Sequence, residues 1–323
     1  MTQRSRRTRR LRRFGLLVVA MVLVAIAFGS VAVATNAAGL GDRWESVLAR
    51  VDRFLAGPVP DRPTVATVRV TDPPATPTPT PTAEPTARPS IDPEAVGPDP
   101  TSTPAPPPTP TPEPVREAVD VDLLDDPDDF FASQVHKDWC AVAGTQMVLA
   151  IHGKGGLSDS FQREIGGRVR EWESRDDSRN GNWGPAAMAL ALDAYGVPGY
   201  EVRAFESRQS ALRDAARSIQ STGAPVILLA WRGAHTWVMT GFRADADPTV
   251  FRDAHIDGAY VLDPWYPRVS SIWGRSDPPG TFQNGSEMER NFLKWRRPEG
   301  RYPDRDQLYI TVAPTVPLEQ VGG

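Results

Sequence analysis

The chain has 323 residues, and 17 of its 33 prolines fall in the 44 residues from 71 to 114. Because proline removes backbone donors and fixes φ, that stretch cannot form a packed core, and the globular part must be smaller than the chain. The single cysteine, Cys140, excludes an intramolecular disulfide framework and a multi-cysteine zinc site.

The net charge of −4 conceals a basic N-terminus, because seven arginines precede the first acidic residue, Asp42. Residues 14–34 then form an uncharged apolar run. As a helix at about 1.5 Å per residue, this run is roughly 31 Å long and matches a bilayer's hydrocarbon thickness. We therefore expect a basic cytoplasmic tail (1–13), a transmembrane helix (14–35) and an extracellular remainder. We interpret the arginines as the signal that keeps the N-terminus in the cytoplasm, and we expect no nucleic-acid partner.

A cleaved signal peptide is the alternative for this region, since Ala32-Val33-Ala34 resembles a small-residue cleavage site. Signal-peptide apolar regions run about 7–15 residues, so the length of this one favours a retained anchor.

Residues 36–56 carry apolar side chains at helical spacing, among them Trp44 and Leu48. The pattern fits an amphipathic helix lying on the outer leaflet, and it fits a short juxtamembrane segment equally well.

Residues 57–116 are predicted to be a Pro/Thr-rich, disordered linker. Its Thr-Pro repeats favour extended polyproline II, a semi-rigid spacer of about 3.1 Å per residue. Thr-Pro repeats outside a membrane are also plausible sites of O-glycosylation. Such a segment would hold the C-terminal part away from the membrane.

Residues 117–323 are predicted to form the globular domain, with helices first and strands later. This order favours an α+β fold with a mainly antiparallel sheet. The expected helices are 138–152, 185–195 and 208–220, and the expected strands are 225–231, 235–242, 259–262 and 307–312.

Cys140 is the first candidate catalytic residue. Asp138 is a good N-cap, which would place Cys140 in the first turn of a helix. Unsatisfied N–H groups and the dipole at a helix start favour a nucleophilic thiolate. A buried, inert cysteine on an amphipathic helix is the alternative.

A cysteine nucleophile needs a base, and His235 opens an apolar strand in the sequence AHTWVMTGF. His152 lies three helical turns from Cys140 and cannot reach it. Asp263 ends the next strand, before Pro264, and supplies an acceptor that could orient an imidazole.

These residues resemble those of papain-like cysteine peptidases of the bacteriocin-leader-processing (double-glycine, family 39-like) type. The matching segments are QVHKDWCAVAGTQMVL, PAAMALALDAYG, GAPVILLAWRGAHTWVMTGF and YVLDPW. The resemblance implies a papain-like fold in which Cys140 is the nucleophile, His235 the base and Asp263 its orienting group. It also implies that Gln134, six residues before the cysteine, helps to form the oxyanion hole.

Two departures limit the resemblance. Many relatives have Cys-Gly-Pro where this chain has Cys140-Ala141-Val142, and no Gly-x4-Gly-Lys-Ser/Thr motif of a transporter ATPase occurs. Cleavage of double-glycine leaders is therefore not implied.

The sequence thus predicts a single-pass, membrane-anchored extracellular cysteine peptidase that acts on a peptide or protein, including cell-wall peptide. No metal or organic cofactor is expected. The alternatives are a cell-wall amidase or endopeptidase, and a catalytically inactive peptide- or wall-binding module.

Overall fold

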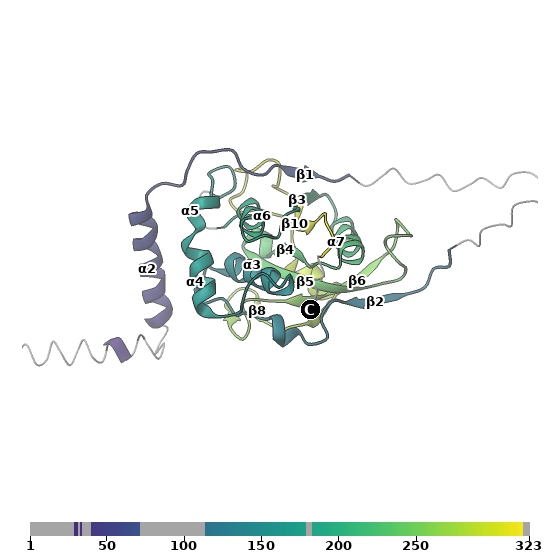
Figure 1. The fold of residues 1–323 in the computed structure, drawn as a ribbon, viewed down its shortest axis with the longest axis horizontal. Coiled ribbons are helices and arrows are strands. Elements are labelled where there is room, and N and C mark those ends of the chain that lie inside the picture. The colour runs from purple at the N-terminus through teal and green to yellow at the C-terminus, as the bar shows by residue number, and fades with distance from the viewer. Residues whose placement is uncertain (1–28, 32, 34–39, 72–113, 179–182, 319–323) are drawn as a thin grey trace, which may run out of the picture.

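The computed structural model describes residues 29–31, 33, 40–71, 114–178 and 183–318 (Figure 1). The predicted transmembrane segment and most of the Pro/Thr-rich stretch lie outside these ranges. Of the helices within them, none combines the length and the apolar character needed to cross a bilayer.

The described part of the domain is built on an eight-stranded sheet in the order β1-β3-β10-β4-β5-β6-β9, with β2 pairing β5. All of its pairings are antiparallel except that of β1 with β3. The strands are β1 (Thr67–Arg69), β2 (Val119–Asp122), β3 (Tyr200–Phe205), β4 (Val226–Ala230), β5 (His235–Ala244), β6 (Ile256–Leu262), β9 (Thr281–Asn284) and β10 (Tyr309–Pro314). A small separate hairpin pairs β7 (Val269–Ser270) with β8 (Gly274–Arg275).

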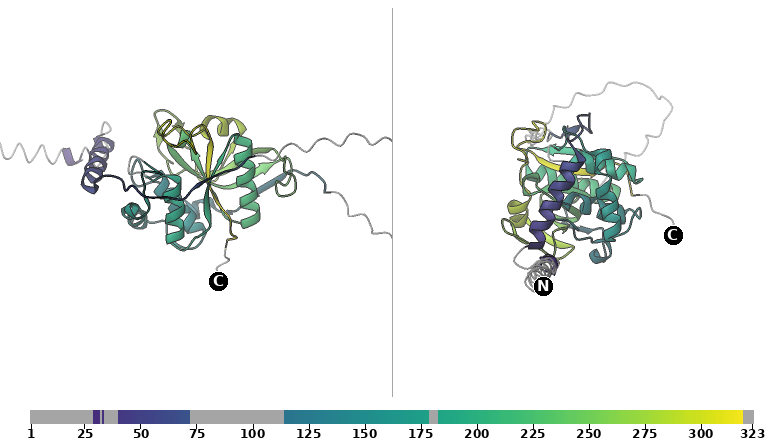
Figure 2. Two further views of the ribbon diagram at one scale, coloured as in Figure 1. Left: turned by 90° about the horizontal axis from the view of Figure 1, so that it is seen from above. Right: turned by 90° about the vertical axis from the view of Figure 1, so that its left-hand side faces the viewer.

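Helices cover both faces of the sheet (Figure 2). One face carries α3 (Cys140–Ile151), α4 (Asp159–Gly167), α5 (Val169–Trp172) and α6 (Pro185–Ala194); the other carries α7 (Arg208–Thr222) and α8 (Gly285–Asn291). Strand β4 shows the division, because Ile227 and Leu229 enter one core while Val226 and Leu228 enter the other. Burial on both faces explains its continuous apolar sequence. The predicted α+β architecture with a mainly antiparallel sheet is confirmed.

Helix ends follow local chemistry. Helix α7 begins where the Ser207 hydroxyl accepts from the Ser210 N–H at 3.0 Å, and it ends at Gly223, whose φ of +67° is left-handed. Helix α3 corrects the sequence-based expectation: its N-cap is Trp139, with no side-chain cap. The Asp138 carboxylate does not cap the helix and instead pairs with Arg53 at 2.6 Å.

Close packing of α3 on β5 positions the candidate site. A Cβ on Gly144 would lie 2.7 Å from Thr236 Cγ2, so a larger residue would push the helix off the strand. Thr236 directly follows His235, the first residue of β5. The glycine therefore brings the N-terminal part of α3 beside the start of β5.

Residues 58–70, which the sequence assigns to the linker, are instead part of the domain. Their strand β1 pairs with β3, with Thr67 opposite Val202. The Arg170 guanidinium donates to the Pro58 carbonyl at 2.7 Å. The sequence TVATVRV explains the result, because β-branched residues favour a strand even between prolines.

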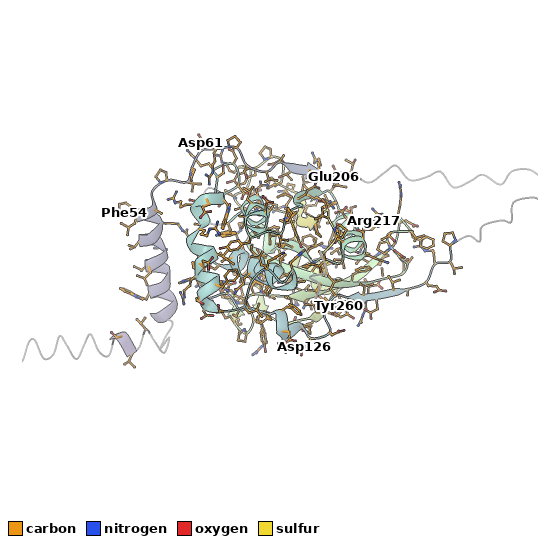
Figure 3. All side chains as sticks on the ribbon, in the orientation of Figure 1. Phe54, Asp61, Asp126, Glu206, Arg217 and Tyr260 are labelled. Atoms are coloured by element: carbon orange, nitrogen blue, oxygen red, sulfur yellow. The ribbon has the colours of Figure 1, made fainter. Side chains whose placement is uncertain are left out.

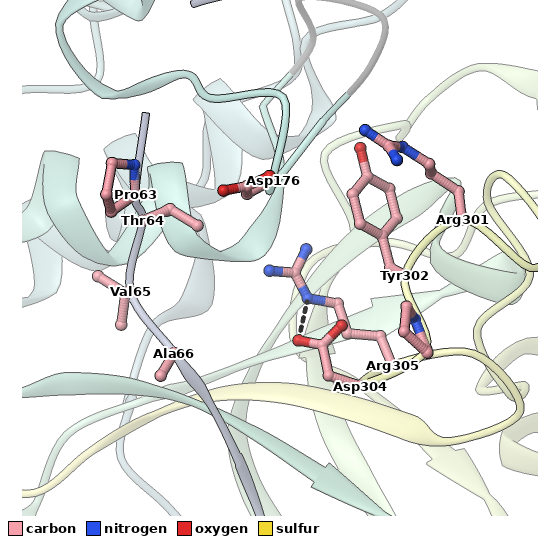
Figure 4. Close-up of a pocket in the computed structure, with 10 residues that line it drawn as sticks. Pro63, Thr64, Val65, Ala66, Asp176, Arg301, Tyr302, Asp304 and Arg305 are labelled. Carbon is pink, nitrogen blue, oxygen red and sulfur yellow. Dashed lines mark ion pairs between the residues drawn. The ribbon is translucent and has the colours of Figure 1, made fainter. Parts of the chain in front are cut away.

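A buried arginine, Arg305, fastens this segment; Figure 4 draws it opposite residues 63–66, together with its ion pair to Asp304. Arg305 Nη1 lies 2.8 Å from Asp177 Oδ1, and both side chains are essentially inaccessible. Arg305 Nε also donates to Thr67 Oγ1 at 3.1 Å. The Asp177 carboxylate accepts from the N–H groups of Ala186 and Ala187 at the start of α6. One ion pair thus joins four separate segments.

Before this strand comes α2 (Leu40–Ala56), which lies beside the domain and carries exposed apolar side chains. Phe54, near its C-terminal end, is 85% exposed (Figure 3). Of the two interpretations of residues 36–56, the described part, 40–56, is thus helical, and its location on a membrane stays a prediction.

Candidate active site

The structure brings three of the four predicted site residues together. Cys140 is the first residue of α3, His235 is the first residue of β5, and Asp263 directly follows β6. Because β5 and β6 are paired, His235 Nε2 lies 2.6 Å from Asp263 Oδ1. Cys140 Sγ lies 4.0 Å from the carbonyl oxygen of Ala234, the residue before His235.

The imidazole of His235 is buried, with 3% of the residue exposed. Burial is the strongest single influence on this group and disfavours the imidazolium. The charge and hydrogen bond of Asp263, together with those of Cys140, outweigh it and raise the pKa of His235 to about 9. Since Nε2 is engaged by Asp263, Nδ1 is the ring nitrogen left for Cys140. The site therefore favours a charged imidazolium beside the sulfur at neutral pH.

Asp263 is itself held in place by the turn that follows it. Its Oδ1 accepts from the Trp265 N–H at 2.9 Å. The Pro264 carbonyl accepts from the Gln134 N–H, also at 2.9 Å. The turn after β6 is thereby tied to the loop that leads into α3.

Gln134, the fourth predicted site residue, is placed differently. Its side chain is buried and does not line the cleft around Cys140. The amide nitrogen donates to the carbonyl oxygens of His136 at 2.9 Å and Lys137 at 2.7 Å. Both amide protons are therefore engaged, and in this structure the side chain shapes the loop before Cys140.

Two further buried glutamines, which sequence reasoning missed, support the same loop. Gln162 Oε1 accepts from the Val135 N–H at 2.6 Å, and Gln162 Nε2 donates to Gln146 Oε1 at 2.8 Å. Gln146 Nε2 in turn donates to the Ser158 carbonyl at 3.0 Å. A signal was present, because Gln146 interrupts the otherwise apolar end of α3, and buried amides are almost always hydrogen-bonded.

The stacking of Trp231 on His235 is the second feature that sequence reasoning did not identify. Its indole stacks on the His235 imidazole, with ring centroids 4.0 Å apart and an angle of 18° between planes. Its Nε1 donates to Asn291 Oδ1 at 3.1 Å. Four tryptophans line the cleft: Trp139, Trp231, Trp265 and Trp295.

The other histidines do not contact Cys140 through any described hydrogen bond. His152 Nε2 bonds the Tyr200 hydroxyl at 3.1 Å, at the far end of α3. His255 is exposed and lies 3.9 Å from Asp257. His136 lines the cleft, with its Nε2 3.0 Å from Arg163 Nη1.

The cleft that contains Cys140 and His235 has a volume of about 1370 Å³. Small-molecule pockets are typically about 300–1,000 Å³, so this one is large enough for a polymeric substrate. Its walls come from α3, α4, the turn before β5, the loop after α8 and the C-terminal part of α2.

A cysteine at a helix start beside a buried His–Asp pair is typical of cysteine peptidases. The family model described as "Peptidase_C39 like family" matches residues 129–290, half of the chain, and the chain belongs to this family of cysteine peptidases. The match spans Gln134, Cys140, His235 and Asp263.

Among solved structures, the chain is similar to "a double glycine motif protease from AMS/PCAT transporter in complex with the leader peptide". The two are 19% identical, the similarity covers 57% of this chain and 91% of that chain, and the TM-score is 0.30. A TM-score this low adds nothing to the fold assignment. No curated protein matches the chain.

Proposed function

We propose that the protein hydrolyses peptide bonds with a catalytic triad of Cys140, His235 and Asp263. The carrying observation is the buried 2.6 Å contact between His235 Nε2 and Asp263 Oδ1, in the cleft that Cys140 opens into. The charge of Asp263 favours the imidazolium, and the imidazolium in turn favours a thiolate on Cys140.

In the first half of the reaction, the Cys140 thiolate forms a bond to the carbonyl carbon of the substrate. The C–N bond then breaks, and His235 gives its proton to the departing amine, which leaves a thioester. In the second half, His235 takes a proton from water, whose oxygen bonds to the acyl carbon. The C–S bond breaks, and the products are a carboxylate, an amine and the restored thiolate.

The tetrahedral oxyanion needs hydrogen-bond donors. The Cys140 N–H is one candidate, because the first amides of a helix have no intrahelical acceptor. Gln134 is the second, as the family resemblance implies. For this role its amide must release the carbonyl of His136 or of Lys137, so loop 136–138 would move when substrate binds.

We further propose that residues 14–35 anchor the chain in a membrane and that the catalytic domain lies outside the cell. The arginine block before an uncharged run of 21 residues supports this topology. The strands on either side of the Pro/Thr-rich stretch, β1 and β2, both pair with the sheet of the domain.

Thiol reactivity tests the proposed triad. The purified full-length chain is treated with iodoacetamide near neutral pH, beside Cys140→Ser and His235→Ala variants. We expect fast labelling of the wild type, none of Cys140→Ser and at least about tenfold slower labelling of His235→Ala. Slow labelling that His235→Ala leaves unchanged would contradict the triad and favour an inactive binding module.

Substrate digestion then separates the two enzymatic functions. Peptide libraries and peptidoglycan fragments are incubated with the wild type and with Cys140→Ser. Cleavage of linear peptides by the wild type alone supports the peptidase. Cleavage restricted to peptidoglycan fragments supports a cell-wall amidase or endopeptidase instead.

A further inference from the structure

The cleft around Cys140 carries a charge opposite to that of the whole protein. The chain has a net charge of −4. The lining of the cleft, however, contains eight lysine and arginine residues against four aspartate and glutamate residues. An excess of one sign in a cleft concentrates ligands of the other sign.

Two of the lining carboxylates, Asp138 and Glu173, are neutralised inside the cleft itself. Asp138 pairs with Arg53 at 2.6 Å, and Glu173 pairs with Arg170 at 2.9 Å. Burial also raises the pKa of Glu173, against the attraction of Arg170. Within each pair the positive and negative charges cancel, so the excess of basic over acidic residues in the cleft is unchanged.

The third lining carboxylate, Asp177, forms an ion pair with the buried Arg305, which does not itself line the cleft. Glu299 is exposed and is the only lining carboxylate without an ion pair in the described part of the chain. Among the described lining residues, Glu299 is therefore the one unpaired negative charge that offsets the basic side chains not yet paired.

Six basic side chains of the lining have no carboxylate partner among the described residues. They are Arg50, Lys137, Arg163, Arg232, Arg296 and Arg297. Each is exposed. Arg163 contacts His136 Nε2 at 3.0 Å and Arg296 donates to Gln307 Oε1 at 3.3 Å, so the charges of both remain unpaired.

These cations come from separate elements that line the cleft with Cys140 and His235. Arg232 lies three residues before His235, and its carbonyl accepts from the Arg296 N–H at 3.0 Å, which groups Arg296 and Arg297 with it. Lys137 and Arg163 come from other elements, the loop before α3 and helix α4. A chain bound at Cys140 would therefore meet positive charge from several parts of the cleft wall.

We infer that the substrate is an acidic peptide, with aspartate or glutamate near the scissile bond. This inference rests on the proposed peptidase function and specifies its substrate class. The aromatic walls formed by Trp139, Trp231 and Trp265 favour a peptide over an anionic polysaccharide, because they offer apolar surface between the charges. Exposed ion pairs each change an equilibrium by about two- to fivefold, so several together give a clear preference.

Binding to a Cys140→Ala variant of the full-length chain tests the substrate class without turnover. Fluorescence anisotropy compares three peptides of equal length that carry glutamate, glutamine or lysine around a central phenylalanine. We expect the glutamate peptide to bind at least about tenfold more tightly than the glutamine peptide, the lysine peptide to bind most weakly, and 0.5 M salt to remove most of the difference. Equal binding of the three peptides, or equally tight binding of an oligogalacturonate, would overturn the inference.

Matched substitutions locate the effect. Adding Arg232→Gln together with Arg297→Gln should weaken binding of the glutamate peptide about fivefold or more and leave the glutamine peptide unchanged. Arg252→Gln removes the same kind of charge from an exposed residue outside the cleft and should change neither. An equal loss from Arg252→Gln would assign the effect to net charge and overturn the cleft assignment.

Cleavage by the wild type separates this inference from the proposed function. Cutting of all three peptides at similar kcat/KM would refute the acidic preference and leave the peptidase function intact. Tight binding of the glutamate peptide with no cleavage of any peptide would refute the peptidase function.

Discussion

The indole of Trp231 lies parallel to the imidazole of His235, with ring centroids 4.0 Å apart. Trp231 has a φ of +50°, an uncommon value for a residue other than glycine, and the neighbouring Arg232 has a φ of +62°. On its way from β4 to β5 the backbone thus turns so that the indole meets the histidine ring. This contact restricts the orientation of His235, the proposed base.

Trp231 is therefore expected to be a positioning residue. Replacing it with leucine should lower kcat about tenfold or more while changing KM less, because the imidazole would no longer be fixed in plane. Trp231→Phe keeps an aromatic ring and should restore most of kcat. If Trp231→Leu and Trp231→Phe lose activity equally, the stacking explanation is wrong.

The charge of Asp263 is expected to set the upper limit of the pH profile. Asp263→Asn keeps a hydrogen-bond partner for His235 but removes the attraction that raises the pKa of the imidazole to about 9. The imidazolium would then lose its proton at lower pH. The kcat/KM of peptide cleavage, measured from pH 5 to 10, should fall off at a lower pH than in the wild type, because cleavage needs the imidazolium proton for the departing amine. An unchanged upper limb would contradict this role for Asp263.

The same pKa shift links folding stability to pH. His235 is charged in the folded state up to about pH 9, whereas in the unfolded state it titrates near its ordinary value of 6.5. The stabilisation that the extra proton on His235 gives to the folded state is thus fully present below pH 6.5 and is lost as the pH rises towards 9. Its upper bound is about 3 kcal/mol, since one pKa unit corresponds to about 1.4 kcal/mol.

Urea unfolding between pH 6 and pH 9.5 measures this linkage. The free energy of unfolding of the wild type should decrease over that range more than that of His235→Gln, so the two curves should converge at high pH. Parallel curves would show that His235 does not hold an extra proton in the folded state.

The sequence points to candidate catalytic residues but not to the contacts that support them. Cys140 and His235 could be identified because each stands at the start of a strongly apolar element. Their proximity depends on the close contact between Gly144 and Thr236, which involves residues 92 positions apart in the printed sequence. No local pattern encodes such a contact.

Other errors came from local signals that the tertiary structure overrides. Asp138 has the chemistry of an N-cap, yet its carboxylate pairs with Arg53, and the helix begins at Cys140. The strand at Thr67–Arg69 is not evident from composition, because prolines lie on both sides of its β-branched run. The spacing of Gln134 could not show that two backbone carbonyls already occupy its amide.

Gly144 offers a direct test of how α3 is placed. Gly144→Ala adds a methyl group that would lie 2.7 Å from Thr236 Cγ2, so the helix and β5 must separate. We expect a loss of about 1–3 kcal/mol in the free energy of unfolding, as for other overpacked cores, together with slower labelling of Cys140. Adding Thr236→Ser removes the opposing methyl group and should recover part of both losses. If Thr236→Ser recovers neither loss, the strain does not arise from the contact between residue 144 and Thr236.

The ion pair between Asp177 and Arg305 is expected to stabilise the domain and to hold β1 in place. Both side chains are inaccessible, so removing either one leaves a buried charge without its partner, at a cost of about 3–5 kcal/mol. Asp177→Ala and Arg305→Ala should each lower the free energy of unfolding by about this amount in urea titrations. The double variant should lose less than the sum, because neither charge is left alone. Arg275→Ala, an exposed control, should change stability by less than about 0.5 kcal/mol.

Limited proteolysis should also cut residues 57–71 faster in Arg305→Ala, since Thr67 loses the bond from Arg305 Nε. Additive losses in the two single variants, or unchanged cleavage of this segment, would show that the ion pair does not fasten β1 to the domain.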